Sequence, residues 1–166
     1  MRVPRDSITI AQATTTGEIA AARELIREYG ESLGIDLSYQ NFEAELESLP
    51  GDYAPPRGAL LLARSADEFI GCIAMRPLAP EICEMKRLYV RPAWRAHGIG
   101  AQLVDTLIAN SRAASYHSLR LDTLPAMKEA RGLYESLGFR EIPAYYESPI
   151  AGTTFLELDL TASRKS

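Results

Sequence analysis

A glycine-containing loop joins an extended segment to a helical one near the middle of this chain. Residues 82–90 are rich in branched and aromatic side chains, which suit a β-strand. Residues 99–113 repeat apolar side chains at helical spacing. Between them stands Arg95-x-x-Gly98-x-Gly100. Because the first amides of a helix lack internal partners and the helix dipole adds positive charge there, this junction predicts a site for phosphate or pyrophosphate.

The surrounding residues narrow the kind of phosphate site. Arg91 and Arg95 are expected to add full positive charges beside the loop. The Gly-x-x-x-x-Gly-Lys-Ser/Thr pattern of a Walker A loop is missing, and so is the third glycine of a dinucleotide fingerprint after Gly100. The alternative is an ordinary strand-to-helix turn that uses glycine for its geometry.

The order of the other elements predicts the fold. The expected strands are 7–12, 59–64, 69–75, 82–90, 118–123, 139–142 and 154–160. The first expected helix follows a capping box at Thr15-x-x-Glu18. Three more helices are expected at 39–49, 99–113 and 126–137. Residues 77–80 are expected to form a turn. This order predicts an α/β fold with a mixed, mostly antiparallel sheet and helices on both faces. It forms one domain over 1–166 with a frayed polar tail from 161.

Composition excludes several classes of partner. A net charge of −4 gives no concentrated basic surface for nucleic acid. The sequence has no apolar run of membrane-spanning length and no apolar signal-peptide core, so we expect a cytoplasmic protein that does not bind membranes.

Cys72 and Cys83 are expected as reduced core thiols, with a cross-strand disulfide as the alternative. Two histidines and two separated cysteines predict no metal cluster. A homodimer is the default expectation for assembly.

Two segments resemble the recurrent motifs of a known enzyme family. Residues 88–100, from Leu-Tyr-Val through the glycine loop, resemble the acetyl-CoA-binding motif of the GCN5-related N-acetyltransferases (GNAT). Residues 130–139, Ala-x-x-Leu-Tyr-x-x-x-Gly-Phe, resemble the family's other recurrent segment. The resemblance covers most of the chain, to about Leu160. One departure is Met127, where many members have an asparagine that helps to hold the cofactor.

The resemblance implies an acyltransferase that moves the acetyl group of acetyl-CoA directly to a primary amine, on a small molecule or a protein, in a ternary complex. It implies a central strand that bulges and splays from its neighbour near Leu88, whose backbone N–H polarises the thioester carbonyl. The cofactor-binding residues that it implies are Leu88, Tyr89, Val90, Arg95, Ala96, His97, Gly98, Ile99, Gly100 and Ala101.

Catalytic roles are expected for a tyrosine and a carboxylate. Tyr134 matches the family's tyrosine and is the candidate acid for the leaving thiolate, with a core tyrosine as the alternative. The acceptor amine must lose protons, so a base is needed. Glu84 is the first candidate and Asp122 the second. On simple alternation Glu84, Lys86 and Leu88 share a sheet face, unless a bulge shifts the parity. An ordinary surface ion pair between Glu84 and Lys86 is the alternative to the catalytic role.

The acceptor itself carries no sequence motif. Tyr53, Tyr145 and Tyr146 are candidates for lining its pocket. A non-catalytic acetyl-CoA-binding regulatory module is the alternative function, because it needs only the glycine loop. An acetyltransferase that acts on charged transfer RNA is disfavoured by the acidic balance of the chain.

Overall fold

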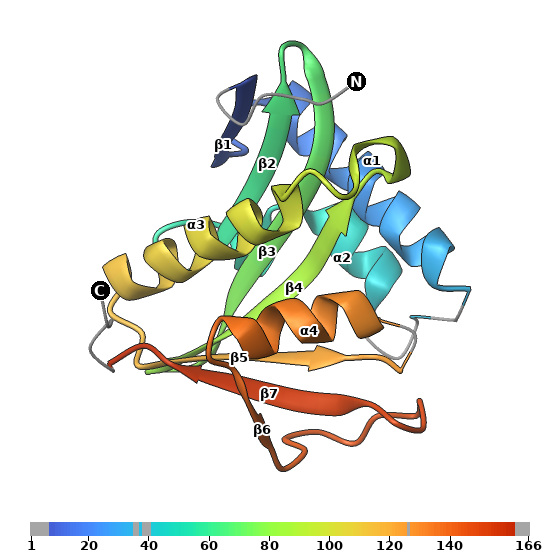
Figure 1. Ribbon diagram of the computed structural model, residues 1–166. Helices are drawn as coiled ribbons and strands as arrows, with labels where there is room; N and C mark the ends of the chain where they lie inside the picture. Colours follow the sequence, from blue (N-terminus) through green and yellow to red (C-terminus); the bar gives the residue numbers. More distant parts are fainter. Residues whose placement is uncertain (1–6, 35–36, 38–40, 126, 162–166) are drawn as a thin grey trace.

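The structure is a computed structural model that describes residues 7–34, 37, 41–125 and 127–161 (Figure 1). The strands are β1 (Ile8–Gln12), β2 (Ala59–Ser65), β3 (Glu68–Ala79), β4 (Ile82–Val90), β5 (Ser118–Thr123), β6 (Arg140–Ile142) and β7 (Thr154–Asp159). The helices are α1 (Thr16–Leu33), α2 (Phe42–Ser48), α3 (Ile99–Ala113) and α4 (Lys128–Ser136), with 3-10 turns η3 (Gly51–Tyr53) and η4 (Pro92–Trp94).

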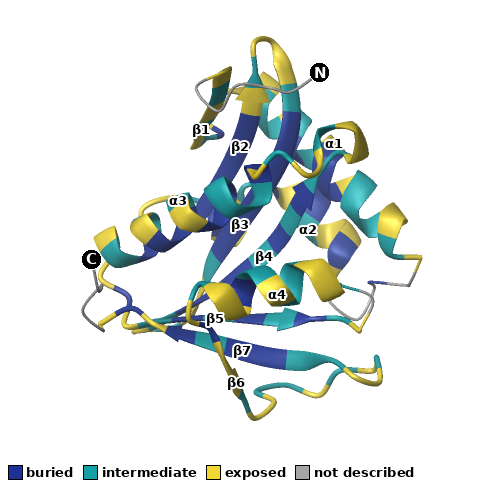
Figure 2. Ribbon diagram, in the orientation of Figure 1, coloured by how far each residue is buried: buried dark blue, intermediate teal, exposed yellow. Residues whose placement is uncertain are grey.

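All seven strands form one sheet in the order β1-β2-β3-β4-β5-β7-β6. The β4–β5 pair is parallel and the other neighbouring pairs are antiparallel. Helices α1 and α2 cover one face of the sheet, and α3 and α4 cover the other (Figure 1). Buried residues concentrate in the central strands and on the helix sides that face them (Figure 2). The predicted α/β fold is confirmed.

Local signals place most of the boundaries. Thr15 Oγ1 accepts the backbone N–H of Glu18 at 3.1 Å, which completes the predicted capping box. The Glu18 carboxylate accepts the N–H groups of Thr15 and Thr14, and these bonds lower its pKa to about 2. The predicted helix starts at 39 and 126, and the tail 162–166, lie outside the described residues.

One predicted turn is wrong. Residues 77–80 were expected to turn, but β3 stays extended to Ala79 and pairs with β4. The ladder shifts register between Pro77 and Ala79. Such an irregularity accommodates a proline, which cannot donate to the ladder.

The central strands separate where the sequence predicted a splay. β4 and β5 pair only over Ile82–Glu84 and then diverge. Beyond this point β4 bulges against β3: Lys86 is opposite Ala74 and Tyr89 is opposite Cys72, while Arg87 has a φ of 63°. Two residues of β4 therefore face one residue of β3, which is the definition of a β-bulge.

The bulge corrects the expectation from simple alternation. Glu84 and Lys86 lie on the face covered by α1 and α2, opposite Arg76 and Ala74. Leu88 packs instead against the core beneath α3 and α4. An extra residue in a strand reverses the parity of every side chain after it.

Candidate active site

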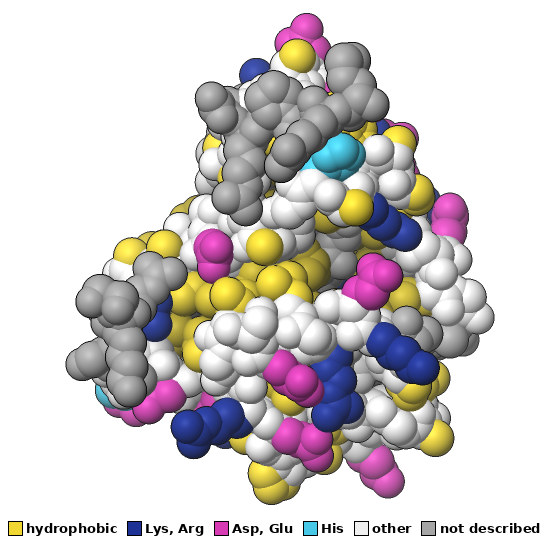
Figure 3. All heavy atoms as spheres, in the orientation of Figure 1, with side chains coloured by type: hydrophobic (Ala, Val, Ile, Leu, Met, Phe, Trp, Pro, Cys, Tyr) yellow, Lys and Arg dark blue, Asp and Glu magenta, His cyan; other side chains and the backbone are white. Residues whose placement is uncertain are grey.

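A cavity of about 600 Å³ opens at the point where β4 leaves β5. Its walls come from α1, β4, the η4–α3 loop, the end of β5 and α4. Hydrophobic side chains gather in the hollow between α3 and α4 (Figure 3). Tyr29 and Lys86 line it from one face of the sheet, whereas Ile99 and Tyr134 line it from the other. The separated strands thus let one cavity reach both faces.

The glycine loop forms one end of this cavity. Ala96 and Gly98 have φ values of 67° and 77°, and Gly98 is the N-cap of α3 without a side-chain cap. The first amides of α3 therefore have no partner within the helix. A Cβ on Gly100 would meet nothing within 4 Å, so the space in front of this helix turn is open. This geometry fits an anion.

Eight of the ten residues predicted to bind the cofactor line the cavity, and only His97 and Ala101 do not. Arg95 is among the eight, and its Nε donates to the Val90 carbonyl at 2.9 Å. Arg91, in contrast, does not supply the charge expected beside the loop. Its guanidinium binds Glu28 of α1 through Nη2 at 2.7 Å and Nε at 3.1 Å.

The bulge beside Leu88 is held by a buried ion pair. Arg87 is only 3% exposed, and its Nε and Nη2 donate to the two Glu45 oxygens of α2 at 2.8 and 2.9 Å. The guanidinium also lies 5.1 Å from the centre of the Phe42 ring. The sequence analysis missed this pair, because its partners are 42 residues apart and share no local motif.

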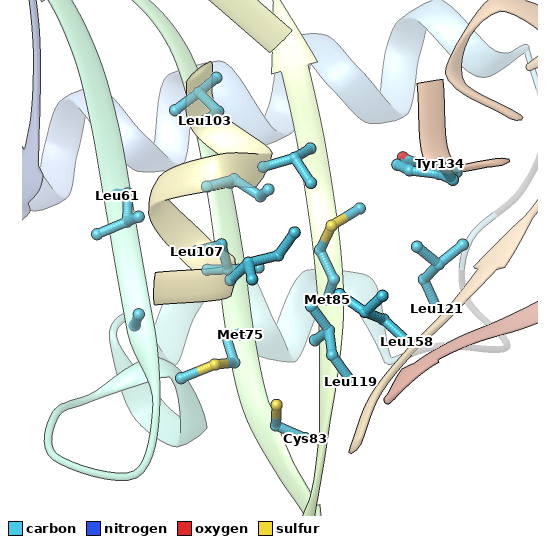
Figure 4. Packing of buried hydrophobic residues seen from close by; sticks show 14 of the residues in the cluster. Leu61, Met75, Cys83, Met85, Leu103, Leu107, Leu119, Leu121, Tyr134 and Leu158 are labelled. Atoms are coloured by element: carbon cyan, nitrogen blue, oxygen red, sulfur yellow. The ribbon is translucent and has the colours of Figure 1, made fainter. Parts of the chain in front are cut away.

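Tyr134 lies on α4 and faces the cavity. Its ring packs against Phe139, and its hydroxyl points toward the side of β4 (Figure 4). Burial raises the pKa of Tyr134, with smaller contributions from Tyr29 and Asp122. The phenol therefore keeps its proton at neutral pH and is able to donate it. Tyr134 also belongs to the core, so packing and a chemical role coexist in this residue.

The two candidate carboxylates differ in their access to the cavity. Glu84 is 1% exposed and does not line it, whereas Asp122 does. Glu84 Oε1 accepts from Arg76 Nε at 2.9 Å and lies 3.8 Å from Lys86 Nζ. The Glu84–Lys86 pair is thus present, but it is buried, so the alternative of an ordinary surface ion pair is wrong.

The tyrosines predicted for the acceptor pocket divide into two groups. Tyr145 donates to Glu84 Oε2 at 2.5 Å, and Tyr146 donates to Asp122 Oδ2. Both rings pack edge-on against Phe155. The segment between β6 and β7 therefore places one phenol on each candidate carboxylate. Tyr53 is 3% exposed and lines a separate hollow of about 220 Å³. None of the three tyrosines is among the residues that line the cavity, so the structure does not bear out their predicted place in its wall.

The two cysteines are not among the residues that line the cavity. Cys72 and Cys83 are free and buried, which confirms the expected reduced thiols. Met127, which stands where many family members have asparagine, lines the cavity.

Within the described ranges, no group of three or more His, Cys, Asp or Glu could hold a metal ion. No helix in those ranges is both long and apolar enough to cross a membrane.

Comparisons with known proteins agree with this geometry. Residues 56–141 match the family model described as an acetyltransferase (GNAT) domain. An uncharacterized N-acetyltransferase of Schizosaccharomyces pombe is 37% identical over 159 residues, covering 93% of this chain and 96% of the relative. Another, of Dictyostelium discoideum, is 30% identical and covers 82% of this chain and 92% of its own length.

Solved structures share the fold. An acetyltransferase from Streptococcus agalactiae superposes with a TM-score of 0.76 at 18% identity, over 92% of this chain and 98% of that one. A GNAT family acetyltransferase from Elizabethkingia anophelis, solved with acetyl-CoA bound, gives a TM-score of 0.68 at 24% identity, over 93% of this chain and 99% of that one.

Proposed function

Since this chain belongs to the GNAT family of acetyltransferases, we propose that it transfers the acetyl group of acetyl-CoA directly to a primary amine within a ternary complex. The observation that carries the proposal is the single cavity that joins the glycine loop, the Leu88 bulge and Tyr134 through the gap between β4 and β5. A cavity open to both faces of the sheet lets two substrates meet at the gap. Holding both reactants in one slot supplies much of the rate advantage.

Binding of acetyl-CoA would rest on backbone groups. The amides from Ala96 to Ala101 would hold the pyrophosphate, and the backbone of Leu88 to Val90 would pair with the pantetheine arm. The Leu88 N–H would donate to the thioester oxygen as negative charge develops there. The open space beside Gly100 supports the placement of the pyrophosphate at this loop.

Proton transfer would involve one carboxylate and one phenol. An acceptor amine similar to lysine, with a pKa of about 10.4, is mostly protonated at neutral pH. We assign its deprotonation to Asp122, because this carboxylate lines the cavity and Glu84 does not. Glu84 would act only through Tyr145 or Lys86, with which it is in contact. Tyr134 would protonate the departing thiolate.

Replacing Tyr134 with phenylalanine is expected to lower kcat by about 100-fold, because a positioned acid typically contributes this much. The affinity for acetyl-CoA should not change, since the ring remains. Steady-state kinetics with calorimetric binding separate the two effects. The matched control is Tyr116→Phe. Tyr116 is buried, and its hydroxyl donates to the Arg57 carbonyl; neither residue lines the cavity. A Tyr134→Phe enzyme with wild-type turnover would remove Tyr134 from the mechanism.

A calorimetric titration with acetyl-CoA tests whether the glycine loop binds the cofactor, and CoA and NADH serve as comparisons. We expect saturable acetyl-CoA binding that weakens by about 100-fold or more in Gly100→Glu, because a carboxylate there repels the pyrophosphate. Gly100 is a better site for this change than Gly98, whose φ of 77° strains any other residue. Unchanged binding by Gly100→Glu, or no binding by the wild type, would mean that the loop is only a turn.

A further inference from the structure

A buried lysine faces the cavity on the side opposite the glycine loop. The Lys86 side chain is 8% exposed and lines the cavity from the face covered by α1 and α2. Its position on β4 is two residues before Leu88, next to the bulge. Burial lowers the pKa of Lys86, whereas the carboxylates of Glu84 and Asp122 act in the opposite direction. A buried ammonium is costly unless acceptors surround it.

The neighbouring Glu84 carboxylate pairs with this ammonium by charge but does not accept a hydrogen bond from it. Both oxygens of Glu84 already accept short hydrogen bonds, one from Arg76 at 2.9 Å and one from Tyr145 at 2.5 Å. Lys86 Nζ lies 3.8 Å from Oε1, beyond hydrogen-bond distance. Within the part of the chain that the structure describes, Lys86 Nζ has no hydrogen-bond acceptor. An ammonium has three donors, so those of Lys86 are available to a ligand in the cavity that Lys86 lines.

The other walls of this part of the cavity carry a complementary pattern. Asp122 also lines the cavity and supplies a negative charge. Leu33 and Leu37 supply apolar surface from the α1 side. A cation and an anion that interact with each other, in a cavity that also has an apolar wall, match a ligand that carries an anion, a cation and an apolar group.

We propose that the acceptor is an amine that also carries a carboxylate, the simplest case being an α-amino acid with an apolar side chain, and that Lys86 binds the carboxylate. The inference rests on the proposed function and specifies its substrate class. Lys86 holds the carboxylate by charge-assisted hydrogen bonds, and Asp122 faces the ammonium. The apolar side chain of the acceptor lies against Leu33 and Leu37.

The reaction balances with these groups and solvent, which restores the Asp122 carboxylate and the Tyr134 phenol and accepts the one net proton released. Asp122 takes a proton from the acceptor ammonium, and the amine nitrogen then bonds to the thioester carbon. The carbon–sulfur bond breaks, and the thiolate takes a proton from Tyr134. The second amine proton leaves as the tetrahedral intermediate collapses and passes to solvent. The carboxylate on Lys86 is unchanged throughout, so Lys86 is a specificity residue and takes part in no bond change.

The test compares each amino acid with its carboxamide, for example L-leucine with L-leucinamide and L-phenylalanine with L-phenylalaninamide. The amide keeps the amine and the shape but removes the charge that Lys86 would bind. For the wild-type protein we expect kcat/KM to favour the acid by about ten- to a hundredfold, which is typical of a hydrogen bond to a charged group. Acetylated product is measured by mass spectrometry, and free thiol by a colorimetric reagent.

Lys86→Met is expected to bring the acid-to-amide ratio to about one, mainly through a higher KM for the acid, with an unchanged Kd for acetyl-CoA. Glu84 keeps Arg76 and Tyr145 in this variant, and circular dichroism checks that it folds. The matched control is Lys128→Met, which removes an exposed cation that also lines the cavity and should leave the ratio unchanged.

Two results would overturn this proposal and leave the acetyltransferase function standing. One is a wild-type protein that acetylates the amides, or amines without a carboxylate, as well as the acids; the acetyltransferase function then stands and only the substrate class falls. The other is a Lys86→Met variant that loses activity equally on both members of each pair, which indicates a structural role or a base. A protein that binds no acetyl-CoA and acetylates no amine overturns both the inference and the proposed function.

Discussion

Replacing Asp122 with asparagine is expected to lower kcat by about 10²- to 10⁴-fold, the usual contribution of a positioned general base. Asparagine keeps an oxygen that can accept the Tyr146 hydroxyl, so the contact that holds the β6–β7 segment is retained. It cannot take a proton from the acceptor. Steady-state kinetics at saturating acetyl-CoA measure the loss, and a calorimetric titration checks that the cofactor site is intact.

Glu84→Gln is the matched comparison for this prediction. The neutral amide leaves Arg76 and Lys86 without their shared anion, so a lower free energy of unfolding is expected. The turnover of the folded fraction should fall by no more than about tenfold, because Glu84 does not reach the cavity. If Glu84→Gln abolished turnover and Asp122→Asn did not, Glu84 would be the base, acting through Tyr145 or Lys86.

Replacing Glu45 with alanine is expected to lower the free energy of unfolding by about 3–5 kcal/mol, because it removes the carboxylate that accepts two hydrogen bonds from the buried Arg87 guanidinium. The same change releases the bulge that positions the Leu88 N–H, so kcat should fall more than the affinity for acetyl-CoA. Urea unfolding followed by circular dichroism measures the first effect, and kinetics at a temperature where the variant is folded measure the second.

Two further variants make the Glu45 prediction specific. Glu47→Ala removes an exposed carboxylate from the same helix and should change the free energy of unfolding by less than about 0.5 kcal/mol. Adding Arg87→Met to Glu45→Ala should recover part of the stability, since it removes the buried guanidinium that has lost the Glu45 carboxylate. A Glu45→Ala loss as small as that of Glu47→Ala would show that the ion pair does not hold the bulge.

Local patterns in the sequence were sufficient for the frame of the site. The spacing of apolar residues gives α3 its observed bounds of Ile99–Ala113, and branched residues give β4 its bounds of Ile82–Val90. The glycines at 98 and 100 locate the loop, because positive φ and open space are properties of glycine itself. The splay and the bulge came from the family resemblance, and the strand pairing confirms both.

Contacts between distant segments could not be predicted in the same way. Arg87 pairs with a residue 42 positions away, Arg91 with one 63 away, and Glu84 with Tyr145, 61 away. Each contact depends on how helices and loops dock on the sheet, and no local period reports that. The face of Lys86 relative to Leu88 depends on one extra residue in the bulge, which alternation alone does not reveal.

The most direct test of the central claim is amine-dependent release of free thiol from acetyl-CoA by the wild-type protein, with the N-acetylated product identified by mass. The account predicts release that saturates in both substrates, requires an amine and yields one acetylated product for each thiol. Saturable acetyl-CoA binding without thiol release, across a panel that includes amino acids, their amides, polyamines and peptides, would contradict it. That result would identify the chain as an acetyl-CoA-binding regulatory module.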